Sequence, residues 1–183
     1  MPDSLPVPED DGATQHLQGC PLPSIFLQST SGETVNLAGL PGLTIVFCYP
    51  RTGASGETIP ASWDAIPGAR GCTPQACSFR DRADDLTGLG VKHIFGLSTQ
   101  DSPYQQEAAQ RLHLPYQLLS DEHLEFANAL KMPTFEWEGK KVLKRVTLAV
   151  VDGTVIYQWY PVFPTDQSAS EVVKWLKTTY NKS

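Results

Sequence analysis

The sequence predicts one α/β domain, built on a mixed central sheet with helices on both faces. Between residues 43 and 130, apolar β-type runs alternate with helical patterns, an order typical of strands joined by helices. A strong hairpin signal and a final helix follow, which adds antiparallel strands to the sheet. A chain of 183 residues is long enough to enclose one full hydrophobic core.

Strands are predicted where short runs are rich in apolar and β-branched residues. These segments are residues 24–28, 31–35, 43–49, 92–98, 116–119, 145–151 and 154–160. The run 43–49 is almost continuously apolar, as expected for a strand buried on both faces, and Pro50 ends it. Asp152-Gly153 separates the last two segments and predicts a tight hairpin.

Helices are predicted where apolar side chains recur with the spacing of one helix face. These segments are residues 73–87, 102–112, 122–130 and 166–180. Thr73 is expected to cap the first helix, with Pro74 at its first position. Asp101 and Asp166 are expected at the start of the second and the last.

Two regions lack such patterns. Residues 1–16 are acidic and rich in Pro, which predicts a flexible lead-in, so the domain is expected to span residues 17–183. Residues 51–70 hold three Gly, two Pro and few periodic apolar residues, which predicts a long loop. Loops of this size in compact domains tend to be functional or mobile.

The composition excludes several classes of partner. The formal net charge is −6, which argues against nucleic acid or an anionic membrane as a main partner, because both require a basic surface. No apolar run is long enough to span a bilayer, and the first residues lack the basic start and apolar centre of a signal peptide. We therefore expect a cytoplasmic protein whose four cysteines are not needed for structural disulfides.

Cys72 and Cys77 are the residues that most directly indicate a reactive site. A helix start at Thr73-Pro74 places Cys72 at the helix mouth, where unpaired N–H groups and the positive end of the dipole favour a thiolate. The thiolate is the reactive form of cysteine. Cys77 follows about one turn later, so a second sulfur lies close behind the first.

The spacing of the two cysteines adds a mechanical constraint. Five residues along an α-helix separate the Cα atoms by roughly 8–9 Å, whereas a disulfide requires less than about 7 Å. If both residues are helical, the sulfurs can bond only after the first turns unwind. The sequence therefore predicts a switch in which oxidation of Cys72 is followed by unwinding and a Cys72–Cys77 disulfide.

Several stretches of the chain together resemble a peroxiredoxin, closest to the Q-type branch that is also called bacterioferritin-comigratory-protein-like. That family is built on a thioredoxin fold. The matching stretches lie between about residues 17 and 176, and the most specific is the block around the two cysteines. They are residues 47–50, 71–81, 96–99, 118–121 and 145–148, the last followed by Asp152-Gly153.

The resemblance implies a thiol peroxidase that uses no metal or organic cofactor. Cys72 would attack a hydroperoxide, either hydrogen peroxide or an organic one, and become a sulfenic acid. Cys77 would resolve that acid as an intramolecular disulfide, and a thioredoxin- or glutaredoxin-type reductant would restore both thiols. A monomer or a homodimer is expected.

The resemblance also implies roles for residues around Cys72. Arg145 matches the family arginine that returns from a distant strand, and its charge would stabilise the thiolate and polarise the peroxide. The backbone N–H groups of Gly71 and Cys72 would hold the peroxide oxygens. Pro50 matches the proline that shields the thiol from water, and Gln75 stands where this branch carries Gln.

The chain departs from the family pattern in front of Cys72. The family places Pro seven residues and Thr three residues before the reactive cysteine, where this chain has Ala65 and Ala69. Pro50 lies 22 residues before Cys72, so 15 residues are inserted. Thr52 is expected to supply the missing hydroxyl, and the other candidates are Ser62 and Thr73. We expect the insertion, which carries Trp63, Asp64 and Arg70, to alter peroxide or reductant preference.

Other interpretations of the same residues remain open. Cys48 and Cys20 are interpreted as structural residues, and a zinc site at Cys72 and Cys77 lacks further ligands with matching spacing. Rival functions are a redox sensor, a specialised biosynthetic enzyme that reuses the reactive thiol, and a disulfide oxidoreductase. The last is weakened because the chain contains no Cys-x-x-Cys.

Overall fold

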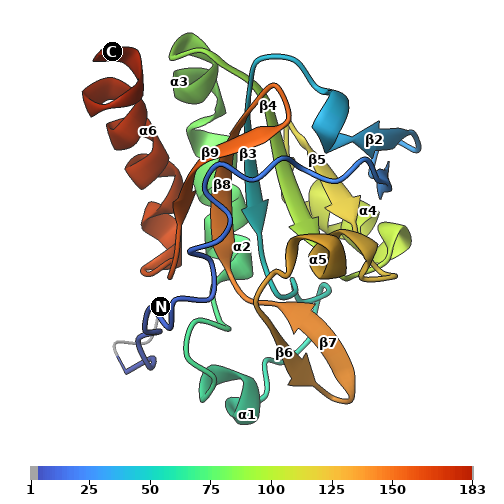
Figure 1. Cartoon of the computed structure of the whole chain (residues 1–183). Helices are drawn as coiled ribbons and strands as arrows, with labels where there is room; N and C mark the ends of the chain where they lie inside the picture. The colour runs from blue at the N-terminus through green and yellow to red at the C-terminus, as the bar shows by residue number, and fades with distance from the viewer. Residues whose placement is uncertain (1–3, 183) are drawn as a thin grey trace.

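The computed structural model describes residues 4–182, so the first three residues of the predicted lead-in and the last residue of the predicted domain lie outside it. Within this range a seven-stranded mixed sheet has the order β2-β1-β5-β4-β3-β8-β9 (Figure 1). Its strands are β1 (Phe26–Ser29), β2 (Thr34–Asn36), β3 (Leu43–Cys48), β4 (Val91–Ser98), β5 (Gln117–Ser120), β8 (Val146–Val151) and β9 (Thr154–Trp159). β3, β4 and β5 run parallel, and the other pairings are antiparallel.

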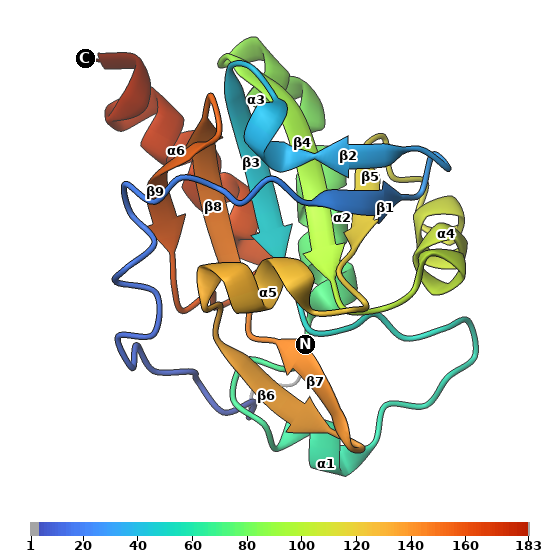
Figure 2. The same ribbon diagram turned by 45° about the vertical axis from the view of Figure 1, so that its right-hand side comes forward.

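Helices lie on both faces of the sheet, which confirms the predicted fold class (Figures 1 and 2). One face carries α2 (Cys72–Asp81), α3 (Ala83–Gly88) and α6 (Ser168–Thr178), and the other carries α5 (Glu125–Leu130). α4 (Ser102–Arg111) packs beside β5. Successive side chains of β3 enter opposite cores, since Phe47 packs with Phe79 and Cys48 with Phe126. This explains why the run is almost continuously apolar.

The helix predicted over residues 73–87 is two helices. The backbone leaves helical geometry at Arg82, where φ is −105° and ψ is 5°. The Arg82 guanidinium there donates to Asp85 and to Ser170 of α6. The last helix also begins later than predicted, because a 3-10 turn (Thr165–Gln167) precedes α6 and Asp166 makes no capping bond. Asp101 does cap α4, accepting from the Tyr104 backbone N–H at 3.0 Å.

A second hairpin was not predicted. It consists of β6 (Thr134–Trp137) and β7 (Lys140–Leu143), joined by Glu138 and Gly139 with positive φ. Its residues are interspersed with Glu and Lys, so the segment resembles solvated charge when only the sequence is considered. The helix α1 (Ala61–Asp64) lies beside this hairpin, within the segment predicted as a loop (Figure 2).

The described part of the lead-in contacts the domain. Asp11 accepts hydrogen bonds from the Tyr160 hydroxyl at 2.8 Å and from the Lys144 ammonium at 3.3 Å. Further on, Gly19 and Cys20 exchange backbone hydrogen bonds with Val155 and cover the outer edge of β9. The division into a lead-in and a domain remains a prediction. Over residues 4–182, none of the helices combines the length and apolar character that a bilayer crossing requires.

Candidate active site

Cys72 is the first residue of α2. The residue before it, Gly71, is the N-cap with φ of 112°, so the predicted cap at Thr73 is wrong by two positions. A Cβ on Gly71 would lie 2.1 Å from Oγ1 of Thr165, which means that the 3-10 turn packs against a backbone with no side chain. The close approach explains why glycine and not a capping hydroxyl begins this helix. Cys72 stands where the first N–H groups of a helix have no partner within it.

Arg145 reaches Cys72 from the start of β8, the strand next to β3. It lies directly before β8, whose first residue Val146 pairs with Cys48 at the end of β3. Its Nη2 donates to the Cys72 sulfur at 3.2 Å and to the carbonyl oxygens of Gly68 and Ala69 at 3.1 and 3.0 Å. The guanidinium therefore fixes both the sulfur and the backbone that leads into α2.

The charge of Arg145 is buried, with only 3% of the residue exposed. None of the ion pairs among residues 4–182 involves Arg145, so no carboxylate within 4 Å balances its charge. A buried cation is costly unless an anion or several strong acceptors surround it. Among the groups that Arg145 contacts, the Cys72 sulfur is the one that can become an anion.

Gln75 and Ser168 complete this polar cluster. Gln75 is fully buried and accepts from Nη1 of Arg145 at 2.5 Å, while its own Nε2 donates to the Ser168 hydroxyl at 3.2 Å. Gln75 was noted in the sequence only because it matches the Q-type pattern. Ser168 was missed, since it lies 93 residues away and nothing in its neighbourhood signals a contact with α2.

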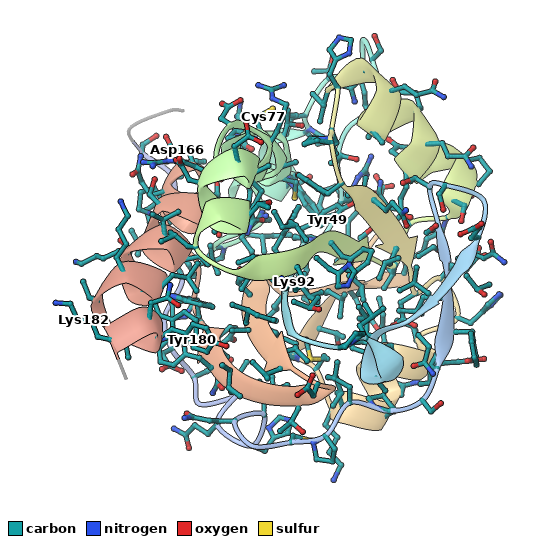
Figure 3. All side chains as sticks on the ribbon, turned by 90° about the horizontal axis from the view of Figure 1, so that it is seen from above. Tyr49, Cys77, Lys92, Asp166, Tyr180 and Lys182 are labelled. Atoms are coloured by element: carbon teal, nitrogen blue, oxygen red, sulfur yellow. The ribbon has the colours of Figure 1, made fainter. Side chains whose placement is uncertain are left out.

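Cys77 lies on the second half of α2 and is half-buried, closer to the outside of the molecule than the enclosed Tyr49 (Figure 3). All four cysteines are free thiols. Cys72 and Cys77 belong to one continuous helix, which is the condition under which the sequence predicts that unwinding must precede a disulfide. A bond between the two sulfurs requires α2 to unwind.

A pocket of about 320 Å³ opens beside Cys72. Cys72, Gly71, Thr73 and Pro74 form one side of it. Most other lining residues come from the inserted segment and the β6–β7 hairpin; they are Arg51, Thr52, Gly53, Glu57, Ile59, Pro60, Trp63, Arg70 and Trp137. Cys72 itself is only 5% exposed, and it lines this pocket.

Thr52 and Pro50 occupy different positions relative to this pocket. Thr52 lines it, and its hydroxyl donates to Oε1 of Gln100 at 3.3 Å. Pro50 is buried and does not line the pocket. Of the other candidate hydroxyls, Thr73 lines the pocket and Ser62 does not. The roles assigned to Thr52 and Pro50 remain predictions.

The inserted segment is held at both of its ends. Near its start, Arg51 and Glu57 form an ion pair, and the Tyr104 hydroxyl donates to Glu57 at 2.8 Å. Near its end, Arg70 pairs with Asp64 at 2.7 Å. Between these pairs, the ring of Trp63 lies 4.9 Å from the ring of Trp137, edge to face.

The two remaining cysteines have no place in this arrangement. Cys48 is fully buried in β3, and burial raises the pKa of its thiol far above the usual range, so it stays protonated. Cys20 is partly exposed, and its thiol donates to the carbonyl oxygen of Pro21 at 3.5 Å. No cluster of three or more His, Cys, Asp or Glu side chains that could hold a metal occurs in the described range.

The fold and this cysteine site agree with the comparisons. The family model described as Redoxin matches residues 17–176, so the chain belongs to the redoxin family. Two of its relatives are a chloroplastic peroxiredoxin Q of Gentiana triflora and the peroxiredoxin Bcp of Escherichia coli. The first is 27% identical over 97% of this chain and 76% of its own length. The second is 27% identical over 85% of this chain and 92% of its own length.

A solved structure agrees on the fold. The peroxidoxin BcpB of Mycobacterium tuberculosis superposes with a TM-score of 0.70 at 24% identity, covering 88% of this chain and 97% of its own. The resemblance to Q-type peroxiredoxins and the thioredoxin-like fold expected from the sequence are thereby confirmed.

Proposed function

We propose that this redoxin is a thiol peroxidase in which Cys72 reduces hydroperoxides. The observation that carries the proposal is the contact between the Cys72 sulfur and a buried arginine that has no carboxylate partner among the described residues. Such a pair supplies an ionised nucleophile together with a fixed positive charge at the point where an oxygen will bear negative charge. The names of the curated relatives support the same activity.

In the first step, the Cys72 thiolate attacks the terminal oxygen of the hydroperoxide. The O–O bond breaks as the S–O bond forms, so sulfur is oxidised and the peroxide is reduced. The leaving oxygen takes up a proton and departs as water or an alcohol, and Cys72 becomes a sulfenic acid. Arg145 and the free N–H groups at the start of α2 stabilise the charge that moves between the oxygens.

In the second step, Cys77 resolves the sulfenic acid. Its sulfur attacks the Cys72 sulfur, the S–O bond breaks and water leaves, which gives an intramolecular disulfide. The position of both cysteines on α2 requires the first turns to unwind before this bond can form. A dithiol reductant of the thioredoxin or glutaredoxin type then returns both thiols, in a reducing compartment such as the cytoplasm.

Mass spectrometry of the protein after one equivalent of peroxide tests both steps. The wild type is expected to lose two hydrogens as a Cys72–Cys77 disulfide, and the Cys77→Ser variant to gain one oxygen on Cys72. The Cys72→Ser variant is expected to consume no peroxide, and Cys20→Ser serves as the control that keeps full activity. Oxidation that begins at a cysteine other than Cys72 would contradict the proposal.

Turnover distinguishes an enzyme from its rivals. With excess dithiothreitol, the wild type is expected to consume many equivalents of peroxide, whereas a redox sensor would consume about one. Reduction of insulin disulfides without any peroxide consumption would favour a disulfide oxidoreductase instead.

A further inference from the structure

The pocket beside Cys72 is larger than hydrogen peroxide requires. Its volume is about 320 Å³, whereas a water molecule occupies about 30 Å³ of the liquid and hydrogen peroxide has only one more oxygen atom. Pockets that bind small organic molecules begin at about 300 Å³. The site therefore has room for a hydroperoxide together with an organic group.

Four of the residues that line the pocket have large apolar side chains or rings. Ile59, Pro60 and Trp63 come from the inserted segment and Trp137 from the β6–β7 hairpin; these four residues are called the apolar wall. Ile59 is 44% exposed, so its side chain is accessible from the solvent side of the pocket. The same pocket is lined by Cys72 at the start of α2.

The charged residues near the wall are engaged with one another. Arg51 is paired with Glu57, and Arg70 is paired with Asp64. These ion pairs offset much of the positive charge that would otherwise attract an anionic ligand. The groups that remain for ligand recognition are the apolar wall and the polar start of α2, which both line the pocket.

The apolar wall is built in advance of any ligand. Trp63 is only 6% exposed and packs against Trp137 at 4.9 Å and Phe135 at 5.8 Å between ring centres. The Arg51 guanidinium carbon lies 5.9 Å from the centre of the Trp63 ring. A ring fixed in this way loses little conformational freedom when a ligand packs against it.

From this geometry we propose that the apolar wall selects hydroperoxides that carry a bulky apolar group, with Trp63 as the main specificity-determining residue. The inference rests on the proposed function and names its substrate class. The hydroperoxide end meets Cys72 and the start of α2, and the organic group packs against Trp63, Ile59 and Trp137. The 15 residues inserted before Cys72 thus supply most of a substrate-binding surface.

The test compares cumene hydroperoxide with hydrogen peroxide as oxidants of Cys72. The second-order rate constant for oxidation is measured by rapid quenching and mass spectrometry, which does not depend on tryptophan fluorescence. Trp63→Ala is expected to lower the constant for cumene hydroperoxide about ten-fold, because the contact with an aromatic ring is lost. The constant for hydrogen peroxide is expected to change less than about two-fold, and Trp63→Phe to restore most of the loss.

A second pair of variants keeps the test independent of packing around Trp63. Ile59→Ser changes an exposed residue of the wall and is expected to lower the cumene hydroperoxide constant about three-fold. Phe26→Ser is the matched control, since Phe26 is 69% exposed and does not line the pocket. This control is expected to change neither constant.

The outcomes separate the two proposals. Equal losses with both peroxides, or no loss with cumene hydroperoxide in Trp63→Ala and Ile59→Ser, would overturn the substrate selection by the wall. If the wild-type Cys72 is oxidised by neither peroxide, the proposed function itself fails. A selective loss with cumene hydroperoxide supports both.

Discussion

The two halves of α2 are held in different ways. The first turn, from Cys72 to Gln75, is bound through polar contacts to Arg145 and Ser168, which come from segments 70 or more residues away. The second half contains Cys77 and is held mainly by packing, since the ring of Phe79 stacks on Phe47 at 4.5 Å. The Tyr116 hydroxyl also donates a hydrogen bond to the Ala76 carbonyl oxygen of the α2 backbone at 2.6 Å.

The difference indicates how one helix can serve two steps. The first turn must hold a sulfur in a fixed field while it meets an oxidant, and charge-assisted hydrogen bonds provide that precision. In the proposed second step, the same turn opens so that the Cys77 sulfur can reach Cys72. Two of the three side-chain hydrogen bonds that link the first turn to Arg145 and Ser168 involve Arg145, and one of them ends on the Cys72 sulfur. In the proposed mechanism, oxidation of this sulfur to an uncharged acid weakens that bond.

Removal of Arg145 should have the largest effect on the first turn of α2. Arg145→Gln is expected to lower the rate constant of Cys72 oxidation about 100-fold, because a fixed donor and its charge leave the reacting centre. Arg145→Lys should recover little, since an ammonium cannot reproduce the fork that binds the sulfur, Gln75 and two carbonyls. Arg82→Gln, at a partly exposed arginine that does not contact Cys72, is the control. A loss below three-fold for Arg145→Gln would contradict this role.

The start of α2 should also be intolerant of a side chain at Gly71. Gly71→Ala is expected to lower the free energy of unfolding by about 2 kcal/mol, because φ is positive and the new methyl group collides with Thr165. Gly32→Ala is a matched control, since its φ is 88° but no atom lies within 4 Å of the added carbon. Urea unfolding of both variants measures the difference. Equal losses would mean that backbone strain alone, and not the contact with the 3-10 turn, sets the cost.

The second half of α2 can be loosened without touching either sulfur. Tyr116→Phe removes the bond to the Ala76 carbonyl, a net loss of about 1 kcal/mol, so the disulfide should form about five-fold faster. Burial raises the pKa of Tyr116 well above its ordinary value, so this hydroxyl stays protonated and keeps donating across the neutral range. Oxidation of Cys72 itself should be unchanged. Tyr157→Phe, an exposed position on β9, is the control, and an unchanged disulfide rate in Tyr116→Phe would remove the tyrosine from this step.

The smallest effect concerns the inserted segment, whose contacts should weaken in acid. The backbone N–H of Ala54, with smaller contributions from Tyr104 and Arg51, lowers the pKa of Glu57 below its ordinary 4.5. A carboxyl whose pKa is lower in the folded state than in the unfolded state stabilises the folded state at any pH above its unfolded-state pKa. This stabilisation is lost as the pH falls through the folded-state pKa. The NMR resonance of the Glu57 carboxyl should therefore titrate below pH 4.5. The contacts of Glu57 with Ala54, Tyr104 and Arg51 should persist as the pH is lowered to that titration. A titration at or above 4.5 would show that these contacts do not hold the segment.

Local patterns in the sequence determined much of the framework. The apolar run before Pro50, the Asp152-Gly153 turn and the cap at Asp101 each depend on residues a few positions apart, and each predicted element is present. Cys72 was placed at the start of a helix for the same reason, although Gly71 and not Thr73 caps it. The cap was misassigned because the contact that requires glycine comes from Thr165, which no local pattern connects to Gly71.

The site itself was decided by tertiary structure. Arg145 meets the sulfur of Cys72 across 73 positions of sequence because β8 pairs with β3 in a register that brings its first residue beside the end of β3. The hairpin that carries Trp137 has only a short alternation, with Phe135 and Trp137 between polar residues, and its contact with Trp63 depends on the packing of segments far apart in the sequence. Short-range periodicity encodes which elements form, whereas the geometry between distant elements follows from strand register and packing, which only the folded chain defines.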